Sequence, residues 1–137
     1  MRVHFESRRF GSLELADDQV IEFPSGLIGL GGSRFALVST DDESPFRWLQ
    51  SLEDPELAVP VTNPFWFFAD YEVNLSDADS ARVGTESPEA VDVWVTVRAL
   101  PDEVTANLKA PIVVHAGRGH QVINEARDFG VRTPLAG

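Results

Sequence analysis

The strongest structural signal is the run Val91-Asp92-Val93-Trp94-Val95-Thr96-Val97-Arg98, in which apolar and polar residues alternate. Alternation of this kind is typical of a half-buried β-strand, and it places the four valines on one face. Trp94 lies on the opposite, polar face. We interpret Trp94 as covered by a loop, because tryptophan is seldom left fully exposed, and a place in a contact surface is the alternative.

Shorter β-like runs fill most of the remaining chain. Predicted strands cover Val3–Phe5, Leu13–Leu15, Val20–Phe23, Phe35–Ser39, Phe46–Gln50, Leu57–Thr62, Phe65–Tyr71, Ile112–His115 and Gln121–Ile123. Turn signals rich in Gly, Pro and Asp separate them roughly every ten residues, which is typical of a barrel or sandwich. Pro60 interrupts one run and predicts an edge position or a bulge there. The sequence therefore predicts an all-β, mainly antiparallel, barrel-like fold.

One short helix is predicted at Asp77–Val83, with Ser76 as its N-cap and Gly84 ending it. The chain of 137 residues has the length of one domain, so we expect residues 1–137 to form a single domain. Residues 124–137 are mixed in character and end in Pro134-Leu135-Ala136-Gly137. We expect them to form a loosely held tail.

The charge is strongly acidic and unevenly placed. The formal net charge is −11, and residues 41–92 contain thirteen acids against only Arg47 and Arg82. A basic footprint is required by duplex nucleic acid and by anionic membranes, so neither is expected as a direct partner. Solubility is one explanation of the acidic middle third, and a surface that steers a basic partner is the other.

Compartment signals are few. The chain contains no cysteine, which excludes disulfides and thiolate chemistry and fits a cytosolic protein. No run approaches the length of about 18 apolar residues that a membrane helix needs. The first residues lack the apolar core of a signal peptide. We therefore expect a cytoplasmic location.

Motifs for cofactor or metal chemistry are incomplete. The glycine cluster at 26–33 lacks the Gly-Lys of a phosphate-binding loop, and Arg34 stands where a dinucleotide fingerprint needs glycine. His115 and His120 flank a predicted hairpin connection at 116–119, but a zinc site needs three or four ligands. We expect a surface role for both histidines, and neither a metal nor a cofactor. Carboxylates are plentiful, so a small β-barrel enzyme with a paired-carboxylate site remains the alternative to a non-enzymatic protein.

Aromatic residues concentrate in Phe65-Trp66-Phe67-Phe68-Ala69-Asp70-Tyr71. Alternation along a strand would place Phe65 and Phe67 on one side and Trp66 and Phe68 on the other. A central strand buried on both faces is one interpretation. The other is that one face forms part of a protein-binding groove, because aromatics are enriched at interface hot spots.

Seven segments in the right order resemble the FliW family of flagellar assembly factors. They are Phe23–Leu30, Phe35–Leu37, Ser44–Ser51, Asp70–Glu72, Val91–Val97, Thr105–Val114 and Gln121–Ile123. The resemblance runs from residue 3 to about residue 135. Each motif is short, and their order and spacing together carry the likeness.

The resemblance implies a small all-β cytosolic protein without enzymatic activity. Members of the family bind the translational repressor CsrA, a basic RNA-binding protein, and relieve its repression of flagellin mRNA. They also bind cytoplasmic flagellin as a chaperone, so that flagellin displaces the repressor in a feedback loop. The family antagonises the repressor away from its RNA-binding surface, and an acidic RNA mimic that competes with RNA is a further alternative.

We expect the partner-binding surface to lie where two of these segments meet. Its predicted residues are Asp70, Tyr71, Glu72, Asn107, Leu108 and Pro111. Acidic neighbours of Tyr71 would steer a basic repressor towards this surface. The alternative for the segment from Asn107 to Pro111 is that it has no binding role and only forms a turn that leads into the next strand.

Overall fold

The structure is a computed structural model, and it describes residues 2–16, 19–24, 26–27, 33–39, 43–69, 71, 73, 75–84, 91–99, 101–123 and 133–135. Strands form half of this part of the chain. They are β1 (Arg2–Ser7), β2 (Gly11–Ala16), β3 (Val20–Glu22), β4 (Arg34–Val38), β5 (Phe46–Ser51), β6 (Ala58–Thr62), β7 (Asp92–Ala99), β8 (Val104–Ala106), β9 (Ile112–His115), β10 (Arg118–Gln121) and β11 (Thr133–Pro134). Two short helical segments accompany them, the 3₁₀ helix η2 (Pro64–Trp66) and the α-helix α1 (Asp77–Val83).

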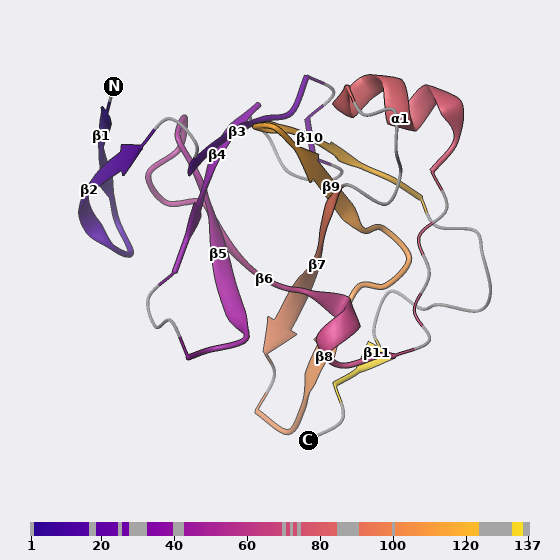
Figure 1. Ribbon diagram of the computed structural model, residues 1–137. Helices are drawn as coiled ribbons and strands as arrows, with labels where there is room; N and C mark the ends of the chain where they lie inside the picture. Colours follow the sequence, from indigo (N-terminus) through magenta and orange to yellow (C-terminus); the bar gives the residue numbers. More distant parts are fainter. Residues whose placement is uncertain are drawn as a thin grey trace.

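Seven strands close into a barrel in the order β3-β4-β5-β6-β7-β9-β10 (Figure 1). Every pairing in this ring is antiparallel except β3 with β10, where Arg118 lies beside Glu22. Closure removes the unpaired edges that an open sheet would present. The predicted all-β, mainly antiparallel barrel with one short helix is confirmed.

The barrel interior is filled by apolar side chains from nearly every strand of the ring. The buried members are Ile21, Phe23, Leu27, Phe35, Leu49, Val61, Ile112 and Val114. Gly119 lies so close to the Phe23 ring that a Cβ there would clash with the ring carbons. A side chain at position 119 would therefore overpack this core.

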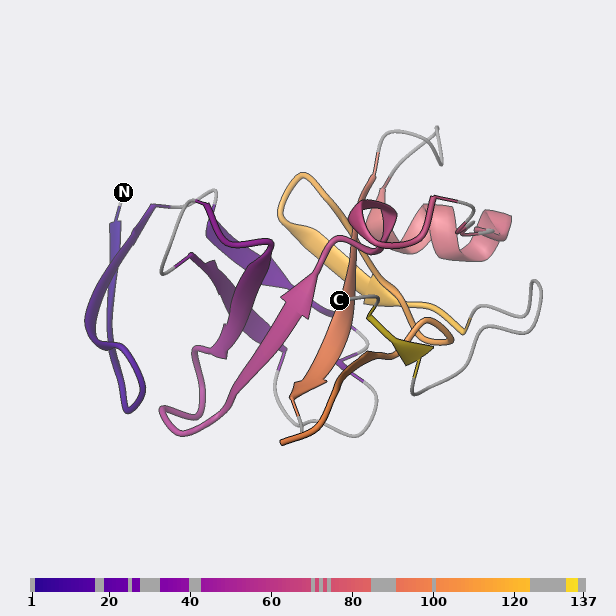
Figure 2. The same cartoon turned by 90° about the horizontal axis from the view of Figure 1, so that it is seen from below.

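Two further apolar clusters pack against the outside of the barrel. The β1–β2 hairpin and α1, which contribute to them, lie on opposite sides of the barrel in Figure 2. On one side, Leu15 of the β1–β2 hairpin packs on Ala36 and Val38 of β4. On the other side, α1 and β8 cover the valine face of β7, with Val93 and Val95 in the buried cluster. The barrel thus carries one appendage on each flank.

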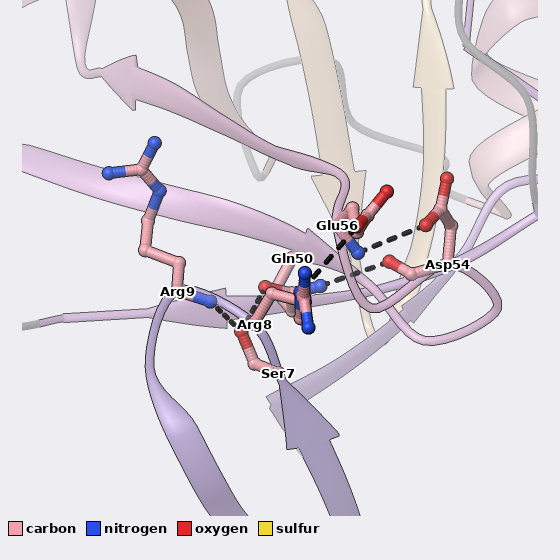
Figure 3. Close-up of polar contacts among 6 residues, drawn as sticks. All are labelled: Ser7, Arg8, Arg9, Gln50, Asp54 and Glu56. Carbon is pink, nitrogen blue, oxygen red and sulfur yellow. Dashed lines mark hydrogen bonds and ion pairs between the residues drawn. The ribbon is translucent and has the colours of Figure 1, made fainter.

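A polar network fastens the hairpin to the barrel, and Figure 3 shows it. The Ser7 hydroxyl donates to Gln50 Oε1 at 2.7 Å, and the Gln50 amide nitrogen donates to the backbone oxygens of Ser51, Asp54 and Leu57. Arg8 lies 3.5 Å from Glu56 in an exposed ion pair. Both partners of the buried Ser7–Gln50 bond are satisfied, so the network fixes the hairpin without leaving an unpaired polar atom.

Three sequence predictions about local structure are confirmed. The helix α1 spans Asp77–Val83; the Ser76 hydroxyl accepts from Asp79 N–H, and Gly84 ends the helix at φ 74°. Along β7, Val93, Val95 and Val97 are buried. Pro60 lies on β6 before its pairing with β7 begins at Val61, so it occupies a local edge as expected.

Other predictions need correction. The connection between β9 and β10 is shorter than predicted, because Arg118 and Gly119 already belong to β10. The predicted strand Gln121–Ile123 therefore begins earlier and ends at Gln121. Within the expected tail, residues 124–132 and 136–137 lie outside the described residues, whereas Thr133 and Pro134 pair with β8.

Candidate partner-binding surface

The aromatic segment after β6 is a 3₁₀ turn, and the predicted strand Phe65–Tyr71 is wrong. The Asn63 side chain accepts from Phe65 N–H at 2.9 Å, and Pro64 takes the first helical position. Proline favours that position because its fixed φ suits a helix start and it has no N–H to leave unpaired. As a result Phe65 and Trp66 are 45% and 54% exposed, and the interpretation as a doubly buried strand fails.

Tyr71 and Leu108 join the two segments predicted to bind a partner. The Tyr71 hydroxyl donates to the backbone oxygen of Leu108 at 2.7 Å. Both residues are buried, with exposed fractions of 3% and 1%. The hydrogen bond from the Tyr71 side chain to the Leu108 backbone therefore holds the two segments together, and a partner would reach the residues around them first.

The segment from Asn107 to Pro111 is a turn anchored at several points. Asn107 N–H donates to the Thr96 oxygen at 2.9 Å, and Asn107 Oδ1 accepts from Lys109 N–H at 3.2 Å. The Pro111 oxygen accepts from Val122 N–H. Asn107 is half-buried, Pro111 is buried and Lys109 is exposed. Of the six predicted contact residues, Asp70 and Glu72 lie outside the described residues.

The 3₁₀ turn presents its two exposed rings in different directions. The Phe65 ring lies 5.8 Å from the Tyr71 ring, next to the Leu108 anchor. The Trp66 ring lies 6.5 Å from Trp94 of β7, at an edge-to-face angle of 85°. Trp94 is half-buried because it packs on the barrel interior, so the barrel core shields it, and not a covering loop as the sequence predicted. Phe65 therefore extends the predicted surface, and Trp66 borders the barrel end.

His120 is buried under α1, which contradicts its predicted surface role. Its Nε2 lies 3.2 Å from Asp79 Oδ1 and 3.5 Å from Arg82 Nη1. The hairpin turn contains only Ala116 and Gly117, so His120 falls inside β10, opposite Val113. His115, on β9, is half-buried. No group of three or more metal-ligating side chains is found in the described part of the chain.

The described acids of residues 41–92 are spread over the barrel. Glu53, Asp54 and Glu56 lie in the loop between β5 and β6, whereas Asp77 and Asp79 lie on α1. Backbone N–H groups of Ser33 and Arg34 donate to Glu53 and lower its pKa below the ordinary value of 4.5. The described acids of this stretch are therefore not confined to one contact face.

A cavity of about 500 Å³ opens at one end of the barrel. Its lining comprises Gln19, Ile21, Leu37, Asp92, Trp94, Val114, Ala116 and Gly117. One carboxylate, Asp92, is among these residues, whereas the paired-carboxylate alternative requires two. Every buried side-chain nitrogen and oxygen in the described ranges has a hydrogen-bond partner. Among the same residues, no helix has the length and apolar character needed to cross a membrane.

Fold and surface together define a small closed β-barrel protein with an aromatic 3₁₀ turn beside an anchored loop. The family model described as "FliW protein" matches residues 4–135. The chain belongs to the FliW family of flagellar assembly factors.

Individual relatives agree with this assignment. The flagellar assembly factor FliW of Desulfitobacterium hafniense (strain Y51) is 38% identical over 135 residues, covering 95% of this chain and 89% of the relative. That of Exiguobacterium sp. (strain ATCC BAA-1283 / AT1b) is 39% identical over 137 residues, covering 96% and 94%. A crystal structure of the flagellar assembly factor FliW superposes with a TM-score of 0.87 at 30% identity, covering 98% of each chain.

Proposed function

We propose that this protein is a cytoplasmic regulator that binds a CsrA-type translational repressor and relieves its repression of flagellin mRNA. It also binds cytoplasmic flagellin as a chaperone, and flagellin displaces the repressor. Membership of the FliW family is the observation that carries the proposal. The action is by binding, without enzymatic activity and without a cofactor.

The contact surface proposed for the repressor is centred on residues 70–72 and 107–111. The Tyr71–Leu108 hydrogen bond supports it, because it brings two segments that are distant in sequence to one place. Phe65 adds a half-exposed aromatic ring beside Tyr71. Aromatic rings next to a rigid support are frequent binding hot spots.

Electrostatics supports a basic partner. The chain carries a net charge of −11, and a CsrA-type repressor is basic. Long-range attraction raises the association rate and makes it sensitive to salt. The acids spread around the barrel would steer the repressor, and Asp70 and Glu72 would contact it.

Charge reversal tests the contact. The variant Asp70→Lys/Glu72→Lys should weaken repressor binding in low-salt calorimetry by about ten-fold or more. The matched control is Asp102→Lys/Glu103→Lys, which changes the net charge equally on the exposed turn between β7 and β8. Equal losses in the two variants would mean that the acids only steer the partner. Unchanged affinity in the first variant would overturn the proposed contact.

A further inference from the structure

The cavity at the barrel end differs in character from the surface proposed for the repressor. Its walls are apolar side chains of four strands: Ile21 of β3, Leu37 of β4, Trp94 of β7 and Val114 of β9. Its volume of about 500 Å³ lies within the range of ordinary ligand pockets. Its size and lining suit an apolar side chain.

One wall of the opening is held rigid by backbone contacts. Ala116 and Gly117 have φ of 49° and 79°, which are the positive values of a tight two-residue hairpin turn. The Gly117 oxygen accepts from Glu22 N–H at 2.8 Å, which ties this turn to β3. This wall of the opening is therefore preformed, and little ordering of the turn would oppose binding there.

Aromatic surface continues from the cavity onto the outside of the barrel. Trp94 lines the cavity, and the Trp66 ring, outside the lining, lies 6.5 Å from the Trp94 ring and remains 54% exposed. Large exposed apolar side chains that adjoin a cavity are a usual mark of a protein-binding site. The cavity and Trp66 thus form one apolar region, which we call the barrel-end site.

Among the described residues that line the cavity, Asp92 carries the one charged side chain. Asp92 is exposed at the rim, and its carboxylate has no hydrogen bond or ion pair with the side chains that the structure describes. A carboxylate beside an apolar cavity complements an apolar side chain that has a Lys or Arg next to it.

We propose that the barrel-end site receives a large apolar side chain from a basic segment of a protein partner, with a neighbouring Lys or Arg paired to Asp92. The inference deepens the proposed function, on which it rests for the claim that the occupant belongs to a protein. It adds an apolar anchor site to the contact centred on Tyr71 and Leu108.

Blocked tripeptides provide the probe, and the chain's three tryptophans provide the readout. Lys-Phe-Lys should cause saturable shifts of the Trp94 and Trp66 indole N–H signals in NMR titrations up to about 10 mM. Trp48, which packs under the β1–β2 hairpin, should not shift. Glu-Phe-Glu should bind about five-fold more weakly, and Lys-Ala-Lys should give no saturable shift.

The variant Asp92→Asn should retain Lys-Phe-Lys binding but lose the preference over Glu-Phe-Glu. Equal binding of the two phenylalanine peptides to the wild-type protein would overturn the basic partner. Non-saturable shifts, or equal shifts at Trp48, would overturn the site. A concentration-dependent shift of Trp94 without peptide would identify a second copy of the chain as the occupant and overturn the proposal.

Failure of this inference is distinguishable from failure of the proposed function. If the peptides fail while repressor and flagellin bind the intact protein, the barrel-end site is wrong and the function stands. If Lys-Phe-Lys binds as described while neither protein binds, the proposed function is wrong. The apolar and basic preference of the site would then stand without an assigned protein partner.

Discussion

Tyr71 and Leu108, which are 37 residues apart in sequence, are joined by a hydrogen bond of 2.7 Å from the Tyr71 hydroxyl to the Leu108 backbone oxygen. The bond is buried and connects the end of the aromatic segment to the turn after β8. Phe65 rests against the same tyrosine ring. The shape of the proposed contact surface therefore depends on a residue that is itself almost inaccessible.

Removal of that hydroxyl should destabilise the protein. Tyr71→Phe keeps the ring and leaves the Leu108 oxygen without this donor, which should cost about 1–3 kcal/mol of unfolding free energy. Urea denaturation measures the loss. Phe68→Leu is the comparison variant. It changes a partly buried ring in the same cluster and so measures how much altered packing alone lowers the unfolding free energy. An unfolding free energy of Tyr71→Phe equal to that of the wild type would contradict the anchoring role.

Truncation of Phe65 tests whether the exposed ring takes part in binding. Phe65→Ala should weaken repressor binding by about ten-fold or more, because central aromatic side chains dominate interface energies. Ile123→Ala is the matched control, because Ile123 is another large apolar side chain that is half exposed. Calorimetry at one salt concentration gives both affinities. An affinity of Phe65→Ala equal to that of the wild type would remove Phe65 from the contact.

Asp79 should contribute more to the free energy of unfolding than Asp77 on the same helix, because Asp79 contacts the buried His120. Both acids stabilise the start of α1 through the helix dipole, which contributes about 0.3–1 kcal/mol each. Asp79→Ala also removes the 3.2 Å contact with His120, so it should cost about 1–3 kcal/mol more than Asp77→Ala. Thermal and urea unfolding measure both. Equal destabilisation would show that the His120 contact contributes nothing.

Glu53 should add a pH-dependent contribution to stability. Its pKa is lowered in the folded protein by backbone N–H donors of Ser33 and Arg34, so the folded state favours the charged form. This stabilisation is present above pH 4.5, the ordinary pKa, and is lost as the pH falls through the lowered value. Glu53→Gln should therefore be less stable than the wild type at pH 7, and the gap should close in acid. A gap that stays constant from neutral to acid pH would refute this.

The barrel could be predicted from local sequence patterns because its strands and turns carry strong local signals. The valine face of β7 follows from strict alternation, and the bounds of α1 follow from Ser76 and Gly84. The 3₁₀ turn was also signalled locally by Asn63-Pro64, but the four aromatic residues that follow have strong β-propensity and favoured a strand.

Positions that depend on the exact length of a turn, or on packing between distant segments, could not be predicted in this way. His120 faces α1 only because the β9–β10 turn contains two residues, which shifts the histidine into β10. The approach of Tyr71 to Leu108 depends on how the aromatic turn and β8 pack beside β7. Family resemblance suggested both segments, whereas their hydrogen bond is visible only in three dimensions. Likewise, four separate strands build the barrel-end cavity, and no single sequence window contains its lining.

The central claim is an exchange of two protein partners on one regulator. Its most direct measurement is a titration of purified flagellin into a preformed complex of this protein with the CsrA-type repressor, followed by size-exclusion chromatography. We expect the repressor to be released in proportion to the flagellin added, while flagellin co-elutes with this protein. Flagellin that joins without releasing the repressor, or a repressor that forms no complex at the outset, would contradict the account.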